Sequence, residues 1–253
     1  MSAKTPHLEK RRARIFAGPN GSGKSSVFEM IAHAFDIGIY VNADEIEKGF
    51  VSKKGVEPSS FGISPFTKSH FKNFIESHPL RRKAKDRGFS TTFRIDDDHV
   101  IRAEGEINSY QAALLADFFR HQLILQGTKF TFETVMSDPS KVELMKTLRQ
   151  NGFRTYLYYV CTLSPMINVA RVKQRVRAGG HPVPEDLIIS RYTRSLENLQ
   201  GAIENSDRAF LWDNSGKRAQ LVLEVFQGNE ITAHATQIPN WVKTYYLDKL
   251  SDS

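Results

Sequence analysis

Nine consecutive residues near the N-terminus constrain this chain more than any other stretch. They are Gly18, Pro19, Asn20, Gly21, Ser22, Gly23, Lys24, Ser25 and Ser26, and they fit the pattern G-x-x-x-x-G-K-[ST]. Glycines in this pattern let successive backbone N–H groups turn inward around a phosphate, and the helix that follows directs its positive end at the same charge. We therefore predict a loop that binds nucleotide phosphates, with Lys24 on the outer phosphates and the Ser25 hydroxyl on Mg²⁺.

The residues on either side of this loop have the pattern that such a loop requires. The short, mostly apolar segment 14–17 is predicted to form a buried strand. After the loop, apolar residues recur at helical spacing: Val27, Phe28, Met30, Ile31, Ala34 and Phe35. The order strand, glycine loop, helix favours a phosphate-binding loop (P-loop) over a glycine-rich surface turn.

Charge and composition limit the class of protein. The 253 residues carry a net charge of +7, which favours polyanionic ligands such as nucleotides, nucleotide sugars or nucleic acid. Enzymes that handle phosphates are commonly basic, so nucleic acid is the less favoured ligand but is not excluded. The single cysteine, Cys161, excludes an intrachain disulfide and suits a reducing compartment. With no apolar run of membrane-spanning length and no signal peptide, we expect a cytoplasmic protein that binds no membrane.

Predicted strands and helices alternate along the chain. After the first strand and helix, strands are expected at 38–41, 129–134, 153–161 and 209–212, and helices at 109–126, 138–150, 164–178 and 185–205. This alternation predicts an α/β fold with a mainly parallel sheet flanked by helices. We expect a flexible tail at 1–12 and one domain at 13–253, with an insertion at 51–108, a helical lid at 163–183 and a C-terminal hairpin and helix at 217–250.

Two carboxylates follow predicted strands at the edge of the sheet where ligands gather. Asp44 comes after the second strand, where it is placed to take a proton from an acceptor hydroxyl, although an aspartate here also suits a helix N-cap. Glu133 ends a strand between apolar neighbours and is followed by Thr134. A carboxylate in such a place binds substrate hydroxyls or the water shell of Mg²⁺, or it pairs with an arginine.

The predicted lid helix carries a run of cations. Arg171 and Arg175 are four residues apart and share one face, as expected of arginines delivered to phosphates, and a Gly179-Gly180 hinge follows them. A solvated charged face is the alternative.

Three further side chains are candidates for ligand contacts. Arg191 either anchors a phosphate or pairs with Glu185 or Glu197, and His181 either assists phosphate binding or is structural. Asn214, after the last core strand, either reads an adenine edge or forms an Asx turn.

Together these residues resemble the zeta-toxin family, the toxin half of the epsilon–zeta toxin–antitoxin systems. The similarity runs from about residue 14 to 215, omitting most of 51–108, and rests on residues 18–25, Asn42-Ala43-Asp44, Phe132-Glu133-Thr134, the strand at 152–162, the arginine-bearing lid and the helix beginning at Val183-Pro184. It implies a P-loop kinase with a shikimate-kinase-like core and a helical lid, which uses ATP and Mg²⁺ to phosphorylate the 3′-hydroxyl of the sugar in UDP-N-acetylglucosamine. It also implies Lys24 on the phosphates, Asp44 as general base, Glu133 near the sugar and Arg171 as the first lid arginine.

The chain departs from the family pattern at three places. The family has Glu-Gly-Thr where this chain has Glu133-Thr134-Val135, so Thr134 matches the substrate-contacting threonine only approximately. The place of a second family arginine is taken by His181, with Arg175 as the nearest substitute. A glutamate that many members supply before the third strand has no clear counterpart in 90–108. The acceptor is therefore less constrained than the fold and ATP binding.

Three functions fit these observations. The first is an ATP-dependent kinase that phosphorylates a nucleotide sugar or a similar small acceptor, with an antitoxin protein as a possible partner. The second is an NTP hydrolase or switch in which water replaces the acceptor. The third is a P-loop protein that binds nucleic acid through phosphate contacts, which requires an affinity that falls steeply with salt.

Overall fold

The computed structural model describes residues 11–96, 99–180 and 182–251. The chain divides into two compact units, one made of Met1–Ile37 with Phe132–Ser253, and the other of Gly38–Thr131. The second unit is thus one continuous segment, inserted in the sequence between the two segments that form the first unit. Residues 1–10 of the predicted tail, and His181, lie outside the described residues.

The first unit is built on a mainly parallel sheet. Its strands follow the order β5 (Phe130–Thr134), β1 (Arg12–Ala17), β6 (Arg154–Cys161), β7 (Arg208–Asp213), β8 (Gln220–Phe226) and β9 (Glu230–Ala233). The central pairs β1–β6 and β6–β7 are parallel, whereas β8 and β9 add an antiparallel hairpin at one edge. This arrangement confirms the α/β fold predicted from the alternation of strands and helices.

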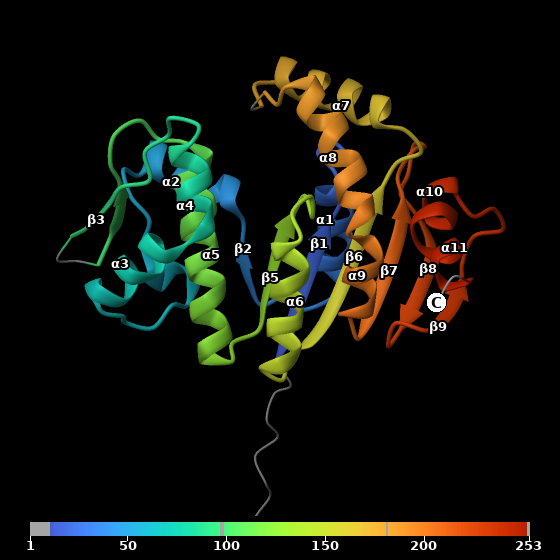
Figure 1. Cartoon of the computed structure of the whole chain (residues 1–253), viewed down its shortest axis with the longest axis horizontal. Coiled ribbons are helices and arrows are strands. Elements are labelled where there is room, and N and C mark those ends of the chain that lie inside the picture. Colours follow the sequence, from blue (N-terminus) through green and yellow to red (C-terminus); the bar gives the residue numbers. More distant parts are fainter. Residues whose placement is uncertain (1–10, 97–98, 181, 252–253) are drawn as a thin grey trace, which may run out of the picture. The chain divides into compact units, whose positions relative to one another are not determined.

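Helices cover both faces of this sheet (Figure 1). They are α1 (Lys24–Ala34), α6 (Ser140–Gln150), α7 (Pro165–Arg177), α8 (Glu185–Glu197) and α9 (Leu199–Glu204), with α10 (Asn240–Val242), η2 (Lys243–Leu247) and α11 (Asp248–Ser251) at the C-terminus. Two consecutive tyrosines of β6 pack against helices on opposite faces of the sheet, because successive side chains of a strand point to opposite sides. Tyr158 packs in a cluster with Val27 and Ile31 of α1, whereas the hydroxyl of Tyr159 lies 2.9 Å from Ser195 Oγ of α8.

A row of rings links three neighbouring strands beneath α1. Phe16, Tyr158 and Phe210 stand in register on β1, β6 and β7 and stack with centroids 4.6 and 5.1 Å apart. Phe28 of α1 meets Phe16 edge-on at 5.2 Å. Stacked and edge-on rings bury large apolar areas in preferred geometries, so this row fixes the helix that begins at the P-loop against the sheet.

The second unit is mostly helical. Its elements are β2 (Ile39–Val41), α2 (Ala43–Ser52), η1 (Pro58–Phe61), α3 (Lys68–Ser77), α4 (Pro79–Lys85), β3 (Phe93–Ile95), β4 (Ile101–Ala103) and α5 (Ser109–Gln126). Phe118 of α5 is fully buried among Phe66, Phe71 and Phe74, with ring centroids 4.9 to 5.3 Å away. This aromatic cluster gives the unit a core of its own.

Helix α5 covers the predicted residues 109–126 and is capped by Asn108, because the Asn108 side chain and Gln111 form a reciprocal capping box. Another helix differs from the prediction. The single helix expected at 185–205 is interrupted at Asn198, between α8 and α9. The Asn198 amide donates to the carbonyl of Met136 at 2.9 Å, which ties this point of the chain to the loop after β5.

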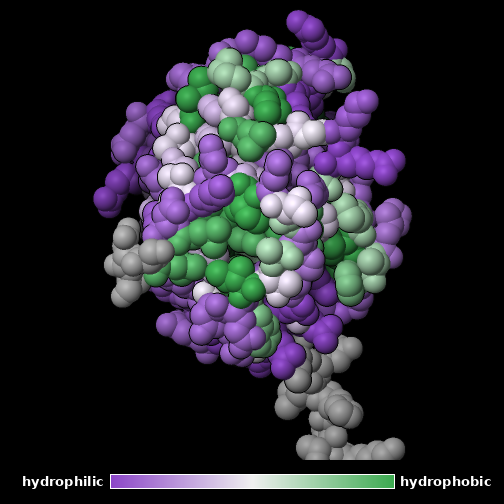
Figure 2. Space-filling view, turned by 90° about the vertical axis from the view of Figure 1, so that its right-hand side faces the viewer, coloured by the Kyte–Doolittle hydropathy of each residue, from purple (hydrophilic) through white to green (hydrophobic). Residues whose placement is uncertain are grey.

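The free edge of the large sheet is formed by β9, all four residues of which are exposed. Figure 2 shows this side of the molecule, where hydrophobic side chains gather among hydrophilic ones. The elements near this edge expose Phe226, Ile231 and Leu250 by 38 to 40%. Within the described parts of the chain, no helix combines the length and apolar character needed to cross a membrane.

Candidate phosphate-binding site

The predicted P-loop connects the end of β1 to the start of α1, and three of its glycines adopt backbone conformations that favour glycine. Gly18, Gly21 and Gly23 have φ values of 138°, 76° and 89°. They are also closely approached. A Cβ on Gly18 would lie 2.0 Å from Val160 O, and one on Gly21 would lie 2.6 Å from Asn168 O. The strand β6 therefore leaves room only for glycine at position 18, and the helix α7 leaves room only for glycine at position 21.

Lys24 begins α1 and reaches back over the loop. Its Nζ donates to the carbonyl oxygens of Gly18 at 2.9 Å and Pro19 at 3.1 Å. Ser25 and Ser26 follow in the first turn of α1 and are exposed. The first N–H groups of a helix have no partner within it, and the positive end of the helix dipole lies at the same place. These features favour an anion in front of the loop, with Ser25 beside it.

Three side chains from different parts of the chain hold the loop, two through its backbone and one through the side chain of Asn20. The Asn214 amide donates to Ser22 O at 2.8 Å, and the Asn168 amide donates to Asn20 O at 2.8 Å. Arg191 Nη1 donates to Asn20 Oδ1 at 3.3 Å. Arg191 therefore contacts the loop itself, and the phosphate contact considered for it stays a prediction. Likewise, Asn214 supports the loop backbone.

Asn168 is a residue that sequence reasoning missed. It is fully buried on α7, and the Thr162 hydroxyl donates to its Oδ1, which leaves the amide nitrogen directed at Asn20. A buried polar side chain requires hydrogen-bond partners. The available signal was an asparagine next to Val169 on the apolar side of the predicted lid helix, but its partner in the loop is 148 positions away.

Two polar groups next to the loop have no hydrogen-bond partner in the described part of the structure. Ser22 is fully buried and its Oγ is unpaired, and Arg171 Nη1 is shielded from solvent and unpaired. Arg171 Nη1 lies 4.0 Å from the Cβ position built on Gly23, and its Nη2 donates to Gly216 O at 3.5 Å. Unpaired buried donors are costly unless a ligand satisfies them. The residues present therefore fit nucleotide phosphates, with the Ser25 hydroxyl placed for a Mg²⁺ ion.

The end of β5 lies beside the first glycine of the loop. Gly18 N–H donates to Thr134 O at 3.2 Å, and Thr134 Oγ1 accepts a hydrogen bond from Met136 N–H at 3.0 Å. Glu133 precedes Thr134 and is partly buried. Both predicted substrate residues therefore lie at the carboxyl end of a strand next to the P-loop. Their contact with an acceptor stays a prediction.

Asp44 lies in the second unit, in the first turn of α2, and its side chain is exposed. The N-cap of this helix is Asn42, whose side-chain oxygen accepts from Asp44 N–H at 2.8 Å. The capping role considered for Asp44 thus belongs to Asn42, two residues earlier. Its role as general base stays a prediction.

The lid helix α7 packs on α8 through Val169, Val172 and Ile188. An ion pair between Lys173 and Glu185, at 2.7 Å, adds to this contact. Arg175 is exposed and its stem packs on Gly180, where an added Cβ would lie 2.7 Å from Arg175 Cγ. In the described structure, Arg171 lies beside Gly23 of the P-loop, whereas Arg175 packs on Gly180 at the end of α7.

Cys161, at the end of β6 behind the loop, is fully buried, and burial raises the pKa of its thiol to about 12. It is therefore protonated at neutral pH and unsuited to nucleophilic chemistry. Among the described residues, no group of three or more histidine, cysteine, aspartate or glutamate side chains is arranged to hold a metal ion.

Solved structures share this fold at low sequence identity. A structure of AvrRxo1-ORF1:AvrRxo1-ORF2 with sulphate ions matches 94% of this chain with a TM-score of 0.55 and 14% identity. A structure of AvrRxo1-ORF1:-ORF2 with ATP matches 89% of it with a TM-score of 0.50 and 15% identity. This chain spans 65% and 61%, respectively, of the chains that it matches. The likeness supports the α/β fold described above.

No protein-family model matches the sequence. An uncharacterized protein of Haemophilus influenzae is 37% identical over 106 residues, which are 39% of this chain and 73% of that protein. Identity at this level over most of the smaller protein indicates common descent. The chain therefore belongs to the same family as this Haemophilus influenzae protein.

Proposed function

We propose that this protein is an ATP-dependent phosphotransferase of the zeta-toxin type, which transfers the γ-phosphate of ATP to a hydroxyl of a nucleotide sugar or a similar small acceptor. The observation that carries the proposal is the rigidly held P-loop with the unpaired guanidinium nitrogen of Arg171 beside Gly23. Phosphoryl transfer needs a positioned phosphate chain and cations near the transferred group. Both kinds of residue lie on the first unit.

Each residue of the loop has a role in this proposal. Backbone N–H groups of the loop and the ammonium of Lys24 bind the phosphates, and the Ser25 hydroxyl holds Mg²⁺. The bound ion neutralises phosphate charge. Arg171 binds oxygens of the transferred phosphoryl group through its planar guanidinium. The fixed backbone of the loop keeps these donors in place, so little reorganisation is needed during transfer.

The acceptor side of the proposal rests on fewer observations. Glu133 and Thr134 are the last two residues of β5, beside Gly18, and in this proposal they bind hydroxyl groups of the acceptor. Asp44 is an exposed carboxylate that takes the proton of the attacking hydroxyl. A nucleotide sugar such as UDP-N-acetylglucosamine is the proposed acceptor because of the zeta-toxin resemblance.

Two findings from the comparisons support the proposal. The protein complex with the same fold, AvrRxo1-ORF1:-ORF2, was solved with ATP and also with sulphate ions. We propose ATP and Mg²⁺ as the cofactors of this chain. Because that structure is a complex of two proteins, we also propose a protein partner, of the antitoxin kind that the resemblance implies.

The test is incubation of the purified protein with ATP·Mg²⁺ and a panel of nucleotide sugars, with phosphorylated products identified by mass spectrometry. Lys24→Ala and Asp44→Ala should both abolish transfer, whereas only Lys24→Ala should abolish ATP binding. Glu45→Ala is the matched control for Asp44, since Glu45 is the next residue, is also exposed and pairs with Lys48. Full transfer by Asp44→Ala would refute the assignment of the base.

The same incubation separates the proposal from an NTP hydrolase, and a binding measurement separates it from a nucleic-acid-binding protein. Release of phosphate at a rate that no acceptor changes would identify an NTP hydrolase instead. Binding of single-stranded or duplex nucleic acid whose affinity falls steeply with salt would favour the nucleic-acid interpretation.

A further inference from the structure

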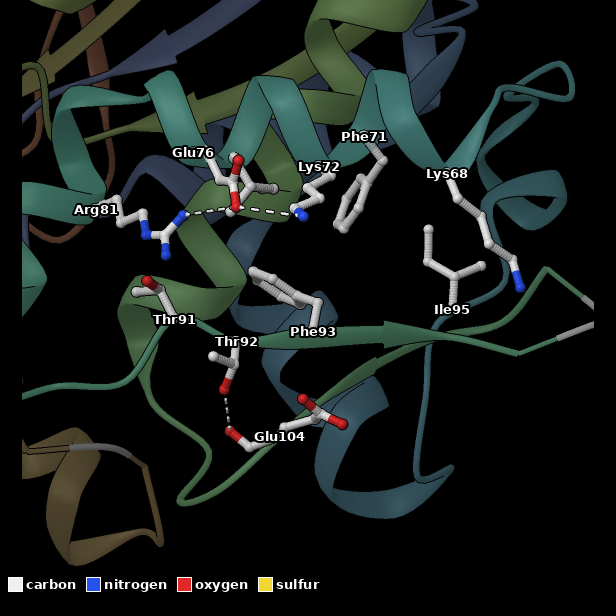
Figure 3. A pocket seen from close by; sticks show the side chains of 11 residues that line it. Lys68, Phe71, Lys72, Glu76, Arg81, Thr91, Thr92, Phe93, Ile95 and Glu104 are labelled. Atoms are coloured by element: carbon white, nitrogen blue, oxygen red, sulfur yellow. Dashed lines mark hydrogen bonds and ion pairs between the residues drawn. The ribbon is translucent and has the colours of Figure 1, made fainter.

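The second unit contains a groove between the helix α3 and the strand β3 (Figure 3). Its volume is about 290 Å³. Phe71 and Ile75 form the helical wall and are only 4% and 5% exposed. Phe93 and Ile95 project from β3 on the other side and are partly buried. Four apolar side chains thus line a groove that is open to solvent.

The backbone of β3 presents unpaired polar groups along one edge. In an antiparallel pair, residues alternate between those bonded to the partner strand and those that face away. Glu104 N–H donates to Thr92 O at 3.0 Å, so Thr92 faces β4. By alternation, the N–H and C=O groups of Phe93 and Ile95 point away from β4.

The opposite edge of this small sheet is occupied. Ile101 of β4 exchanges two hydrogen bonds with Val56, each 2.9 Å long. Within the described residues, the sheet contains only β3 and β4, and β3 has no second neighbour. An exposed strand edge with free backbone groups is a template for another strand.

Charged side chains mark the two ends of the groove. In Figure 3, Lys68 lies at one end and Arg81 at the other, with Lys72 between them. Glu76 lies 4.0 Å from Lys72 and 3.8 Å from Arg81, so two cations share one carboxylate. With Glu104 as the other acidic residue, the lining has three cations and two carboxylates.

We infer that this groove binds an extended, acidic peptide segment of a partner protein, which adds a third strand at the free edge of β3. Its backbone would pair with Phe93 and Ile95, and a bulky apolar side chain would pack among Phe71, Ile75 and Phe93. Acidic residues on either side of that side chain would meet Lys68 and Arg81. Strand addition obtains affinity from main-chain hydrogen bonds and specificity from alternate side-chain pockets.

The dimensions of the groove favour a peptide over a small compound. Its helical wall extends from Lys68 to Glu76, which is roughly 12 Å at 1.5 Å per residue. Its strand wall extends from Thr91 to Ile95, roughly 13 Å at 3.3 Å per residue. About four extended residues therefore match its length. A compact ligand would leave the outward backbone groups of β3 unpaired.

The inference is independent of the reaction at the P-loop, and binding tests it directly. The probes are fluorescein-labelled heptapeptides in which Val-Phe-Val, Val-Tyr-Val or Leu-Ile-Leu is flanked on each side by two glutamates. Fluorescence anisotropy with the full-length protein should give micromolar dissociation constants. N-methylation of alternate backbone nitrogens should abolish binding, because it removes the donors that pair with β3.

Variants of the protein separate backbone pairing from side-chain contacts. Ile95→Pro removes an outward N–H without breaking a bond to β4 and should weaken binding at least tenfold, whereas Ile95→Val should change it less than twofold. Lys68→Gln should weaken binding several-fold. Arg94→Gln is its matched control, because Arg94 is a cation on β3 that, by alternation, faces away from the groove. Thermal melting checks that each variant is folded.

Three results would overturn the inference. One is that no peptide in the panel binds with a dissociation constant below about 1 mM, where binding energy falls to roughly 4 kcal/mol. Another is equal binding by the N-methylated peptides or by Ile95→Pro. The third is that phenyl phosphate competes with the peptides as effectively as they compete with one another, which would identify a small-molecule site.

Discussion

The side-chain amide of Asn214 donates a 2.8 Å hydrogen bond to the backbone carbonyl of Ser22, 192 positions earlier in the sequence. Asn214 is only 9% exposed, and its nitrogen would lie 2.0 Å from a Cβ on Gly23. One side chain thus both supports the P-loop and excludes any residue but glycine at its sixth position. This contact joins the loop after β7 to the loop after β1.

Asn214→Ala should weaken ATP binding, because the carbonyl of Ser22 loses its buried partner and the loop gains freedom. The cost in stability should be about 1 to 3 kcal/mol. Asn205→Ala is the matched control, since the Asn205 amide donates to Gly201 O at the same 2.8 Å but at the end of α9. Chemical denaturation and calorimetric titration with ATP measure the two effects. Equal loss of ATP affinity in both variants would contradict a specific role for Asn214.

Gly23→Ala should abolish ATP binding. An alanine at φ 89° costs roughly 1 to 2 kcal/mol, and its Cβ would also displace the Asn214 amide. Gly152→Ala separates these causes, because Gly152 has φ 75° but no atom within 4 Å of an added Cβ. The Gly152→Ala variant should lose only the free energy of unfolding that the unfavourable backbone conformation costs, and it should bind ATP with unchanged affinity. If Gly23→Ala binds ATP as tightly as Gly152→Ala, the steric argument is wrong.

Much of the first unit could be predicted because local patterns specify it. The glycine loop, the apolar strand of β6 and the proline after Ser164 each indicate an element through neighbouring residues. Asn198 shows where this approach fails. An asparagine within a continuous apolar periodicity does not by itself show that the helix breaks there, and its amide bonds both to Arg194 O one turn earlier and to Met136 O, 62 positions away. Such an interruption depends on a tertiary contact.

The position of the glycine loop could likewise be predicted from neighbouring residues, because its motif lies between an apolar strand and an amphipathic helix. The roles of Lys24 and Ser25 stay predictions of that motif. The support from Asn168 and Arg191 arises only when α7 and α8 pack beside the loop. Long-range hydrogen bonds of this kind leave no periodic signal in a single sequence. The groove beside β3 was missed because it depends on which edge of a three-residue strand remains unpaired.

Arg171→Ala should lower the rate of phosphoryl transfer by on the order of 10³-fold, since this guanidinium is proposed to neutralise charge on the transferred group. Arg171→Lys should not restore the rate, because an ammonium lacks the planar fork. Arg177→Ala is the control, as Arg177 is exposed in the last turn of the same helix. Single-turnover kinetics with saturating ATP measures the chemical step. An unchanged rate in Arg171→Ala would remove it from the proposed mechanism.

The folding stability should fall as the pH is lowered from 8 towards 5, in part because of His121. Burial, and the charge of His70, whose ring lies 6.2 Å away, lower the pKa of His121. Its Nδ1 is buried without a hydrogen-bond partner in the described structure, and Phe74 packs against the ring at 5.3 Å. Below pH about 6.5 the unfolded chain therefore binds a proton at this position that the folded chain does not, which favours unfolding.

His121→Phe should reduce this pH dependence, because phenylalanine keeps a ring beside Phe74 but has no proton to bind. Only the difference in pH dependence between the variant and the parent protein isolates the contribution of His121. His33→Gln, at an exposed position in the last turn of α1, is the control for replacing a histidine elsewhere. Urea unfolding at half-unit steps of pH measures these differences. Parallel pH profiles for the parent protein and His121→Phe would show that burial of this histidine does not couple folding to protonation.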